Sequence, residues 1–140
     1  MNIGTRSILF GAHQFLVHPF FVFIAWWRLF GFPRAQRLWV AFIVHDWGYW
    51  GKPNMDGEEG ESHPELGSRL MGWLFDREHH DPWKLAKKYG AQSWHDFALY
   101  HSRFYAKKHG CKHSDLCLAD KLATCITPRW LYLICVNLTG

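Results

Sequence analysis

The sequence lacks the features that mark membrane-spanning and disulfide-rich secreted proteins. Its most apolar window, residues 20–27, is eight residues long before Arg28 interrupts it, whereas a membrane-spanning helix needs about twenty. The N-terminus shows no apolar stretch followed by a small-residue cleavage site. The four cysteines all lie in the last thirty residues and form no CxxC pair. We therefore expect no transmembrane segment and a cytoplasmic protein with reduced thiols. The Trp- and Phe-rich window leaves attachment to a membrane surface open.

Acidic side chains are missing from the first part of the chain. None precedes Asp46, and they are then dense from Asp56 to Glu65. The totals of 16 Lys and Arg against 12 Asp and Glu give a formal net charge of +4. An excess this mild, without a clustered basic stripe, does not indicate a specific nucleic-acid partner. With 49% hydrophobic residues in a length of 140, the composition predicts one folded domain spanning residues 1–140.

Signals for β-strands are nearly absent, because no alternating run is flanked by an Asn-Gly or Asp-Gly turn. Apolar residues recur instead at spacings of three and four, so we expect a compact all-α bundle of about six to seven helices. The predicted helices cover residues 19–30, 34–49, 63–75, 82–89, 92–108, 114–126 and 128–137. Ser62 and Ser114 are candidates to cap two of them, Ser62 in a capping box with Glu65. The polar residues 51–62 predict a loop that could act as a lid.

Histidine and tryptophan are abundant, with ten and nine copies in this short chain. Histidine in that number raises a metal hypothesis before any motif is considered. The adjacent pair His45-Asp46 ends an apolar run, LWVAFIV. Burial of an unpaired carboxylate there would cost several kcal/mol, and a cation is the natural group to neutralise it. Neighbours on a helix point about 100° apart, which suits a carboxylate that bridges two ions while the imidazole holds one of them.

Further candidate ligands stand on other predicted helices. They are His18, His63, His101 and Asp120. Asp120 lies in an apolar helical stretch, where a carboxylate again needs a partner. Together with His45-Asp46 they give four imidazoles and two carboxylates, a set that suits two divalent ions among Mn, Fe, Co, Ni, Zn and Mg. Two ions that share a water lower its pKa, which makes hydroxide available for in-line attack on phosphorus.

The order H…HD…H…H…D of these residues resembles the HD superfamily of metal-dependent phosphohydrolases, in its dinuclear branches. Four segments carry the resemblance, which covers about residues 10–126: VHPFFVFIA, AFIVHDWG, HPELG and LADKLA. The resemblance implies a helical bundle with two ions bridged by Asp46. The ligands of the first ion would be His18, His45, Asp46 and Asp120. The second ion would be held by Asp46, His63 and His101.

The resemblance also implies an activity, the hydrolysis of a nucleotide or another small phosphorylated compound. A hydroxide between the ions would be the nucleophile, and Arg103 or Lys52 would help the cations to stabilise the phosphoryl charge. Lys121, next to Asp120, could serve in the same way. Many members have HDxGK, whereas this chain has HDWGYWGK, which displaces Lys52 by three residues. The HHExxDGxGYP segment of the cyclic-dinucleotide phosphodiesterases is missing, so that substrate class is not expected.

Two other functions are compatible with the same ligands. Some proteins that resemble this six-ligand arrangement use a mixed-valent iron pair to activate dioxygen and cleave a C–C or C–P bond, so a dinuclear iron oxygenase is one alternative. The other is a metal-stabilised helical module, without enzymatic activity, whose Trp-rich face binds a protein partner.

Several residues have alternative interpretations. His13 competes with His18 as the first ligand, and we prefer His18 because Val22 four residues later fits the first-helix pattern. His95 is a possible substitute for His101. Trp47, Tyr49 and Trp50 are either core residues or a stacking platform for a nucleobase. A rival zinc site would use the segment HGCKHSDLC, whose candidate ligands are His109, Cys111, His113 and Cys117.

Overall fold

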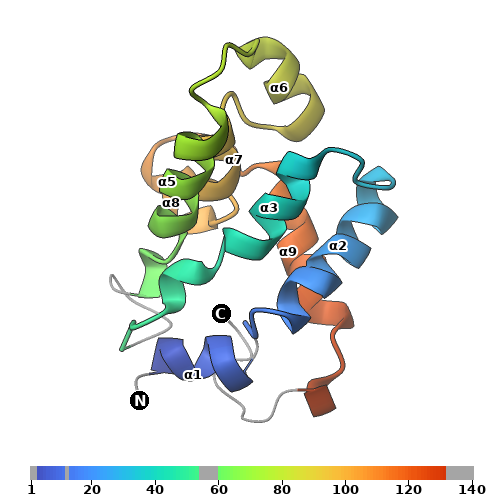
Figure 1. Cartoon of the computed structure of the whole chain (residues 1–140), viewed down its shortest axis with the longest axis vertical. Helices are drawn as coiled ribbons and strands as arrows, with labels where there is room; N and C mark the ends of the chain where they lie inside the picture. The colour runs from blue at the N-terminus through green and yellow to red at the C-terminus, as the bar shows by residue number, and fades with distance from the viewer. Residues whose placement is uncertain (1–2, 12, 54–59, 132–140) are drawn as a thin grey trace.

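The computed structural model describes residues 3–11, 13–53 and 60–131, and within these residues the chain is helical with no β-strand (Figure 1). The prediction of an all-α fold is confirmed. The α-helices are α1 (Ile3–Phe10), α2 (Val17–Phe30), α3 (Gln36–Val44), α5 (Pro64–Phe75), α6 (Pro82–Tyr89), α7 (Trp94–Leu99), α8 (Arg103–Lys108) and α9 (Asp115–Ile126). Short 3-10 turns, η1 (Trp47–Tyr49) and η2 (Arg129–Leu131), follow α3 and α9.

Two pairs of helices form the body of the fold. Helix α2 packs along α9, and α5 packs along α7. Helix α3 contacts both α2 and α5, and so joins the two pairs, as Figure 1 shows. Helix α1 crosses the lower end of this arrangement and contacts η1, the turn that follows His45-Asp46. The end of α3 therefore reaches the place where both pairs of helices meet.

An aromatic core holds these helices together. The Trp26 ring on α2 lies 5.7 Å from Phe42 on α3, 5.8 Å from Phe97 on α7 and 6.0 Å from Tyr89 on α6, measured between ring centroids. All four residues are buried. Rings at this spacing contribute about 0.5–1.5 kcal/mol per pair beyond the burial of apolar area. This core fixes α2, α3 and α7, the helices that carry or precede four of the candidate ligands.

Two predicted helices are shorter than expected, and both end next to a candidate ligand. The helix expected over 34–49 stops at Val44, and a 3-10 turn follows. The helix expected over 92–108 divides into α7 and α8, with His101 in the break. At both breaks the histidine ring bonds a backbone carbonyl of the preceding helical turn. Such side-chain bonds compete with the helical hydrogen bonds and favour a helix end.

The two ends of the chain also differ from expectation. Helix α1 was not predicted, and it contributes Ser7 and Ile8 to the buried residues. Of the helix expected over 128–137, the structure describes only η2, and the remainder lies outside the described residues. The loop expected over 51–62 is described at both ends, whereas residues 54–59 lie outside the described part.

Of the two predicted serine caps, Ser62 is wrong, whereas Ser114 has the predicted position without the predicted capping bond. His63, not Ser62, is at the N-cap position of α5, and Pro64 occupies the first turn. Ser62 instead accepts a hydrogen bond from Lys52 Nζ at 2.7 Å, while Glu65 accepts one from the Tyr105 hydroxyl. Ser114 is at the N-cap position of α9, but its hydroxyl donates to the Phe97 carbonyl at 2.7 Å. Tertiary partners have replaced the local capping bonds in both places.

None of the described helices combines the length and the apolar character needed to cross a membrane. The longest apolar helix is α2, with 14 residues. Cys111, Cys117 and Cys125 are free thiols, and Cys135 lies outside the described residues.

Candidate metal centre

The candidate ligands of the sequence come together around Asp46. They form two groups that share this residue, and in each group one potential ligand atom per residue lies within 4.8 Å of the others. We call the first the acidic group; its members are His18, His45, Asp46 and Asp120. We call the second the histidine group; its members are Asp46, His63 and His101. Asp120 is half-buried and the other five residues are buried.

The acidic group is built by the α2–α9 pair and the end of α3. His18 lies in the first turn of α2, and its Nε2 is 2.7 Å from Asp120 Oδ1 and 3.0 Å from Asp46 Oδ2. His45, directly after α3, places Nε2 at 3.3 Å from Asp46 Oδ2 and 3.4 Å from Asp120 Oδ1. Two imidazole nitrogens and two carboxylate oxygens therefore face one point.

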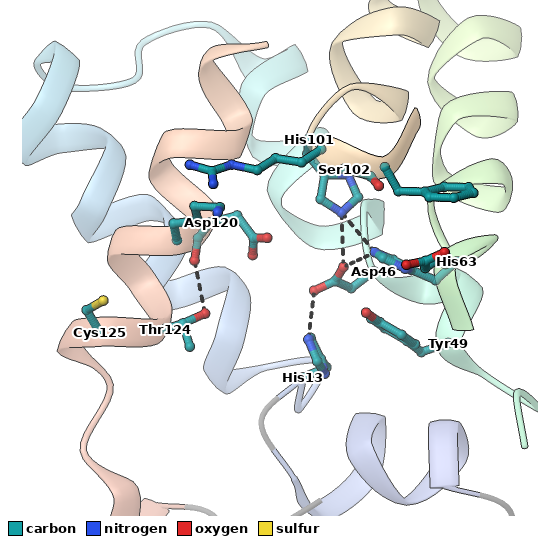
Figure 2. Close-up of a pocket in the computed structure, with 13 residues that line it drawn as sticks. His13, Asp46, Tyr49, His63, His101, Ser102, Asp120, Thr124 and Cys125 are labelled. Atoms are coloured by element: carbon teal, nitrogen blue, oxygen red, sulfur yellow. Dashed lines mark hydrogen bonds and ion pairs between the residues drawn. The ribbon is translucent and has the colours of Figure 1, made fainter. Parts of the chain in front are cut away.

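The histidine group uses the other oxygen of Asp46. Asp46 Oδ1 lies 3.4 Å from His63 Nε2 and 3.3 Å from His101 Nε2. Figure 2 shows the Asp46 carboxylate with His63 and His101 beyond one oxygen and His13 on the opposite side. One carboxylate thus presents a different oxygen to each group, which is the arrangement expected of a bridging ligand.

Two glycines permit the close packing that brings His63 to Asp46. A Cβ on Gly48, two residues after Asp46, would collide with the His63 carbonyl. A Cβ on Gly67 would collide with the Val44 carbonyl at the end of α3. Both obstacles are backbone atoms, which cannot move aside as a flexible side chain can. The HDWG and HPELG segments therefore meet because each has a glycine at the contact.

Three of the four ligand histidines use the same kind of backbone partner for Nδ1. In each the ring nitrogen bonds the carbonyl of the residue three positions earlier. The pairs are His45 with Phe42 at 2.9 Å, His63 with Gly60 at 2.9 Å and His101 with Ala98 at 2.6 Å. A carbonyl oxygen can only accept, so Nδ1 carries the hydrogen in all three rings. In the neutral rings the Nε2 lone pair is then directed at Asp46, as in metal sites whose ligand histidines are oriented by a backbone carbonyl.

Two contacts at the centre are unfavourable without a cation. The Nε2 atoms of His63 and His101 are 3.1 Å apart, and in neutral rings both carry lone pairs because both Nδ1 atoms are donors. Asp46 Oδ2 is buried and has no hydrogen-bond partner of acceptable geometry among the described residues. A buried oxygen without such a bond costs about 1–3 kcal/mol, and more when charged. Metal ions at the two groups would satisfy both sets of atoms, so these residues fit the metal site that the resemblance implies.

The acidic group attracts protons when it holds no metal. Burial lowers the pKa of His18, but the hydrogen bond to Asp120 and the Asp46 carboxylate, whose Oδ2 lies 3.0 Å from His18 Nε2, outweigh it and raise this pKa to about 9. For His45, burial is likewise outweighed by the charge of Asp46 and a hydrogen bond to Asp120, and its pKa lies well above 6.5. The same contacts overcome burial at Asp46 and Asp120 and hold the pKa of both carboxyls below the ordinary range.

The histidine group behaves differently. Burial lowers the pKa of His63, and the hydrogen bond to Asp46 only partly opposes this effect. Tyr49 stacks on the His63 ring, with centroids 3.9 Å apart and planes inclined by 9°. This stacking restricts the orientation of the His63 ring. Sequence reasoning left Tyr49 as either a core residue or a base-stacking platform; it is buried, whereas Trp47 and Trp50 are exposed.

His13 lies beside His18 as an additional buried residue of the centre. His18 belongs to the acidic group, and His13 does not. His13 places Nε2 at 3.8 Å from Asp46 Oδ2, and its Nδ1 bonds the Ser7 hydroxyl at 2.7 Å. Burial lowers the pKa of His13 to about 4. The sequence analysis treated the two histidines as alternatives for one position. The unexpected helix α1 supplies Ser7 as a partner for His13, and both histidines lie near Asp46.

A cavity of about 530 Å³ opens above the centre. Among its lining residues are Asp46, His63, His101 and Asp120, together with the basic residues Arg103 and Lys121 and the acidic residue Glu61. Arg103, which begins α8, is thus at the position that the sequence suggested for a phosphate contact. Lys52 does not line this cavity, and its Nζ bonds Ser62. Lys121, in contrast, lines the cavity. The family pattern alone did not indicate which of the two lysines would do so.

The remaining alternatives do not assemble into metal groups. His95 lies outside both groups and pairs with Asp96 at 3.0 Å. The residues of the rival zinc site form no ligand group among the described residues. Cys117 is buried, whereas Cys111 is exposed and its thiol contacts the His109 carbonyl.

Comparison with known proteins adds no relative. No protein-family profile, no curated protein sequence and no solved structure matches this chain. The resemblance to the HD superfamily therefore rests on the order of the ligand residues and the short segments around them. What the structure itself contains is a buried cluster of histidine and aspartate side chains that could bind metal ions.

Proposed function

We propose that this chain is a metal-dependent phosphohydrolase acting on a nucleotide or another small phosphorylated compound. The observation that carries the proposal is the position of Asp46, which directs one oxygen to the acidic group and the other to the histidine group. This arrangement divides six candidate ligands into two groups, each of which could hold a cation, beneath an open cavity. Dinuclear centres of this kind serve hydrolysis of phosphate compounds by stabilising both the attacking and the leaving oxygen.

The residues would hold the ions in the two groups already described. His18, His45 and Asp120 would bind one ion, His63 and His101 the other, and Asp46 both. Imidazole and carboxylate donors suit Mn, Fe, Co, Ni or Zn, and carboxylates also suit Mg. When bound, such cations lower the pKa of water and neutralise charge on a phosphoryl group.

The protein residues around the centre supply orientation and charge. The carbonyl bonds of His45, His63 and His101 keep each Nε2 directed at the centre. Arg103 and Lys121 are basic residues on the cavity wall. The Arg103 guanidinium offers a planar fork that matches two phosphate oxygens, and Lys121 offers a point charge. We assign the phosphate contacts to these two residues and not to Lys52.

The proposal is tested with metal-free protein loaded separately with Mn, Fe, Co, Ni and Mg. Each form is incubated with a panel of nucleotides and phosphomonoesters, and released phosphate is measured. We expect metal-dependent hydrolysis that falls more than about 100-fold in Asp46→Ala, since loss of a residue that only orients a metal ligand already costs 10–100-fold. Asp96→Ala, which removes a carboxylate outside both groups, should retain the activity.

Three results would contradict the proposal in different ways. Less than one equivalent of metal in the wild-type protein, with the same content in Asp46→Ala, would show that the proposed metal centre does not exist. Oxygen consumption by the iron-loaded protein without phosphate release would indicate the oxygenase instead. Metal that stabilises the protein against heat, without turnover of any compound, would indicate a structural module.

A further inference from the structure

A second hollow, which the proposed reaction does not use, lies next to the cavity of the metal centre. Its volume is about 680 Å³, and we call it the basic hollow. Its wall includes Arg103, Lys107, Lys112, His113 and Asp115. Arg103 also lines the cavity above the metal centre, so one basic residue belongs to the walls of both spaces.

The charge of this region is strongly one-sided. Residues 97–114 contain one Arg, three Lys and three His but neither Asp nor Glu. Arg103, Lys107 and Lys112 form no ion pair within the described part of the chain. Three positive charges around one hollow, each without a carboxylate partner, repel one another. Their arrangement is favourable when an anion occupies the space between them.

Asp115 is the acidic residue on the wall of the basic hollow. Its Oδ1 lies so close to Gly90, at the end of α6, that a Cβ on Gly90 would approach it to 3.1 Å. The carboxylate therefore packs against backbone. Because the wall has three basic residues, Arg103, Lys107 and Lys112, and one carboxylate, the net charge of its Arg, Lys and Asp side chains is positive.

We infer that the basic hollow binds a second anionic group of the substrate, a phosphate separate from the one at the metal centre. The inference rests on the proposed function for the first phosphate and narrows the substrate class to compounds with two phosphate groups. Arg103, which lines both spaces, would remain on the phosphate at the metal centre. Lys107 and Lys112 would bind the second phosphate. A compound with one phosphate would leave these charges unpaired.

We expect the basic hollow to give the protein a preference for substrates with two phosphates, and this preference should depend on salt concentration. Lys107 and Lys112 are exposed, so solvent and ions screen their attraction for a phosphate. The second phosphate should therefore strengthen binding moderately at physiological salt and more strongly at low salt. A contact of that kind discriminates between substrates that present one or two phosphates.

The test uses phosphonates, because their P–C bond is not broken by phosphate-ester hydrolysis. Affinities of the Mn-loaded protein are measured by calorimetry for alkylphosphonates and for α,ω-alkylbisphosphonates with two to six carbons. We expect bisphosphonates of one or two chain lengths to bind about tenfold more tightly than the monophosphonate of equal length. An optimum in chain length is expected because the metal centre and the basic hollow are a fixed distance apart. Only carbon chains that match this distance allow both phosphonate groups to bind.

Two double variants of equal charge change separate the hollow from general electrostatics. Lys107→Gln/Lys112→Gln removes two positive charges from the basic hollow. Lys84→Gln/Lys87→Gln removes two from the exposed surface of α6, outside both cavities. We expect the preference for bisphosphonates to disappear in the first variant and to persist in the second. Equal loss in both variants would overturn the inference, and so would equal affinity for mono- and bisphosphonates at every length.

The titration is repeated on metal-free protein. Its result and the result of the hydrolysis assay together distinguish failure of the inference from failure of the proposed function. Bisphosphonate binding that depends on Lys107 and Lys112, in a protein that hydrolyses no phosphate compound, would refute the proposed function and support the hollow as an anion site. Hydrolysis of phosphomonoesters without any preference for a second phosphate would support the function and refute the inference.

Discussion

The acidic and histidine groups share Asp46, yet the metal-free protein accommodates its buried charge differently on the two sides. In the acidic group two carboxylates raise the pKa of His18 to about 9 and that of His45 well above 6.5, against the effect of burial, so protons take the place of a cation. In the histidine group burial lowers the pKa of His63, and its Nε2 faces that of His101 at 3.1 Å. A metal must displace protons from one side, but it only relieves repulsion on the other.

The two groups also differ in how the fold supports them. Helices α2 and α9, of 14 and 12 residues, carry His18 and Asp120 and pack along each other. His63 and His101 lie outside helices, just before α5 and just after α7. Their positions depend on backbone carbonyls, on the Tyr49 ring and on the glycine contacts between η1 and α5. His18 and Asp120 are thus held by the packing of two helices, whereas His63 and His101 are held by contacts of helix ends, as His45 is.

The largest effect is expected from substitutions that test whether Asp46 joins two separate sites. Wild-type protein should bind about two equivalents of Mn, and Asp46→Ala less than one. Asp120→Ala and His101→Ala should each retain about one equivalent, because each removes a ligand from one group only. Metal content after dialysis provides the measurement, with Asp96→Ala as the control. A single equivalent in wild type, lost in every variant, would show that the two groups form one site.

A moderate effect is expected from pH. In His101→Ala, which keeps the acidic group intact, metal binding must release protons from His18 and His45. Its affinity should therefore rise with pH between 6 and about 9, the range in which His18 loses its proton, by up to about tenfold per pH unit for each proton released. In Asp120→Ala the remaining ion is held by the histidine group, where the lowered pKa of His63 leaves its ring neutral at pH 7.

The Asp120→Ala protein should accordingly show little change in metal affinity above pH 7. Calorimetry in buffers of different ionisation enthalpy measures the protons released by each variant. Equal pH dependence in the two variants would contradict the difference between the groups.

The smallest effect is expected at Tyr49. Replacement by Leu removes the ring that stacks on His63 at 3.9 Å, and should weaken metal binding in the histidine group by about tenfold. Tyr49→Phe keeps the stacked ring and should retain most of this affinity. Both substitutions are measured in the Asp120→Ala background for the histidine group and in the His101→Ala background for the acidic group. A larger loss in the acidic group would show that Tyr49 acts through His13, whose ring it contacts at 4.4 Å.

The sequence by itself determined the helical class and the six residues of the acidic and histidine groups. Apolar spacing of three and four residues is a local property, and it survives in α2, α3, α5 and α9. Asp46 and Asp120 could be recognised because each interrupts an apolar segment, where a lone carboxylate is unfavourable in any fold. These inferences required no knowledge of which helices touch.

Only the tertiary structure decided how the six candidate ligands are divided between the acidic and histidine groups, and which neighbouring residues contact them. It ended helices at His45 and His101, placed His13 beside His18, and put Lys121 on the cavity wall while Lys52 bonds Ser62. Each outcome depends on contacts between segments far apart in the chain, such as η1 against α5. Side chains there compete for backbone carbonyls and space that local sequence patterns do not specify.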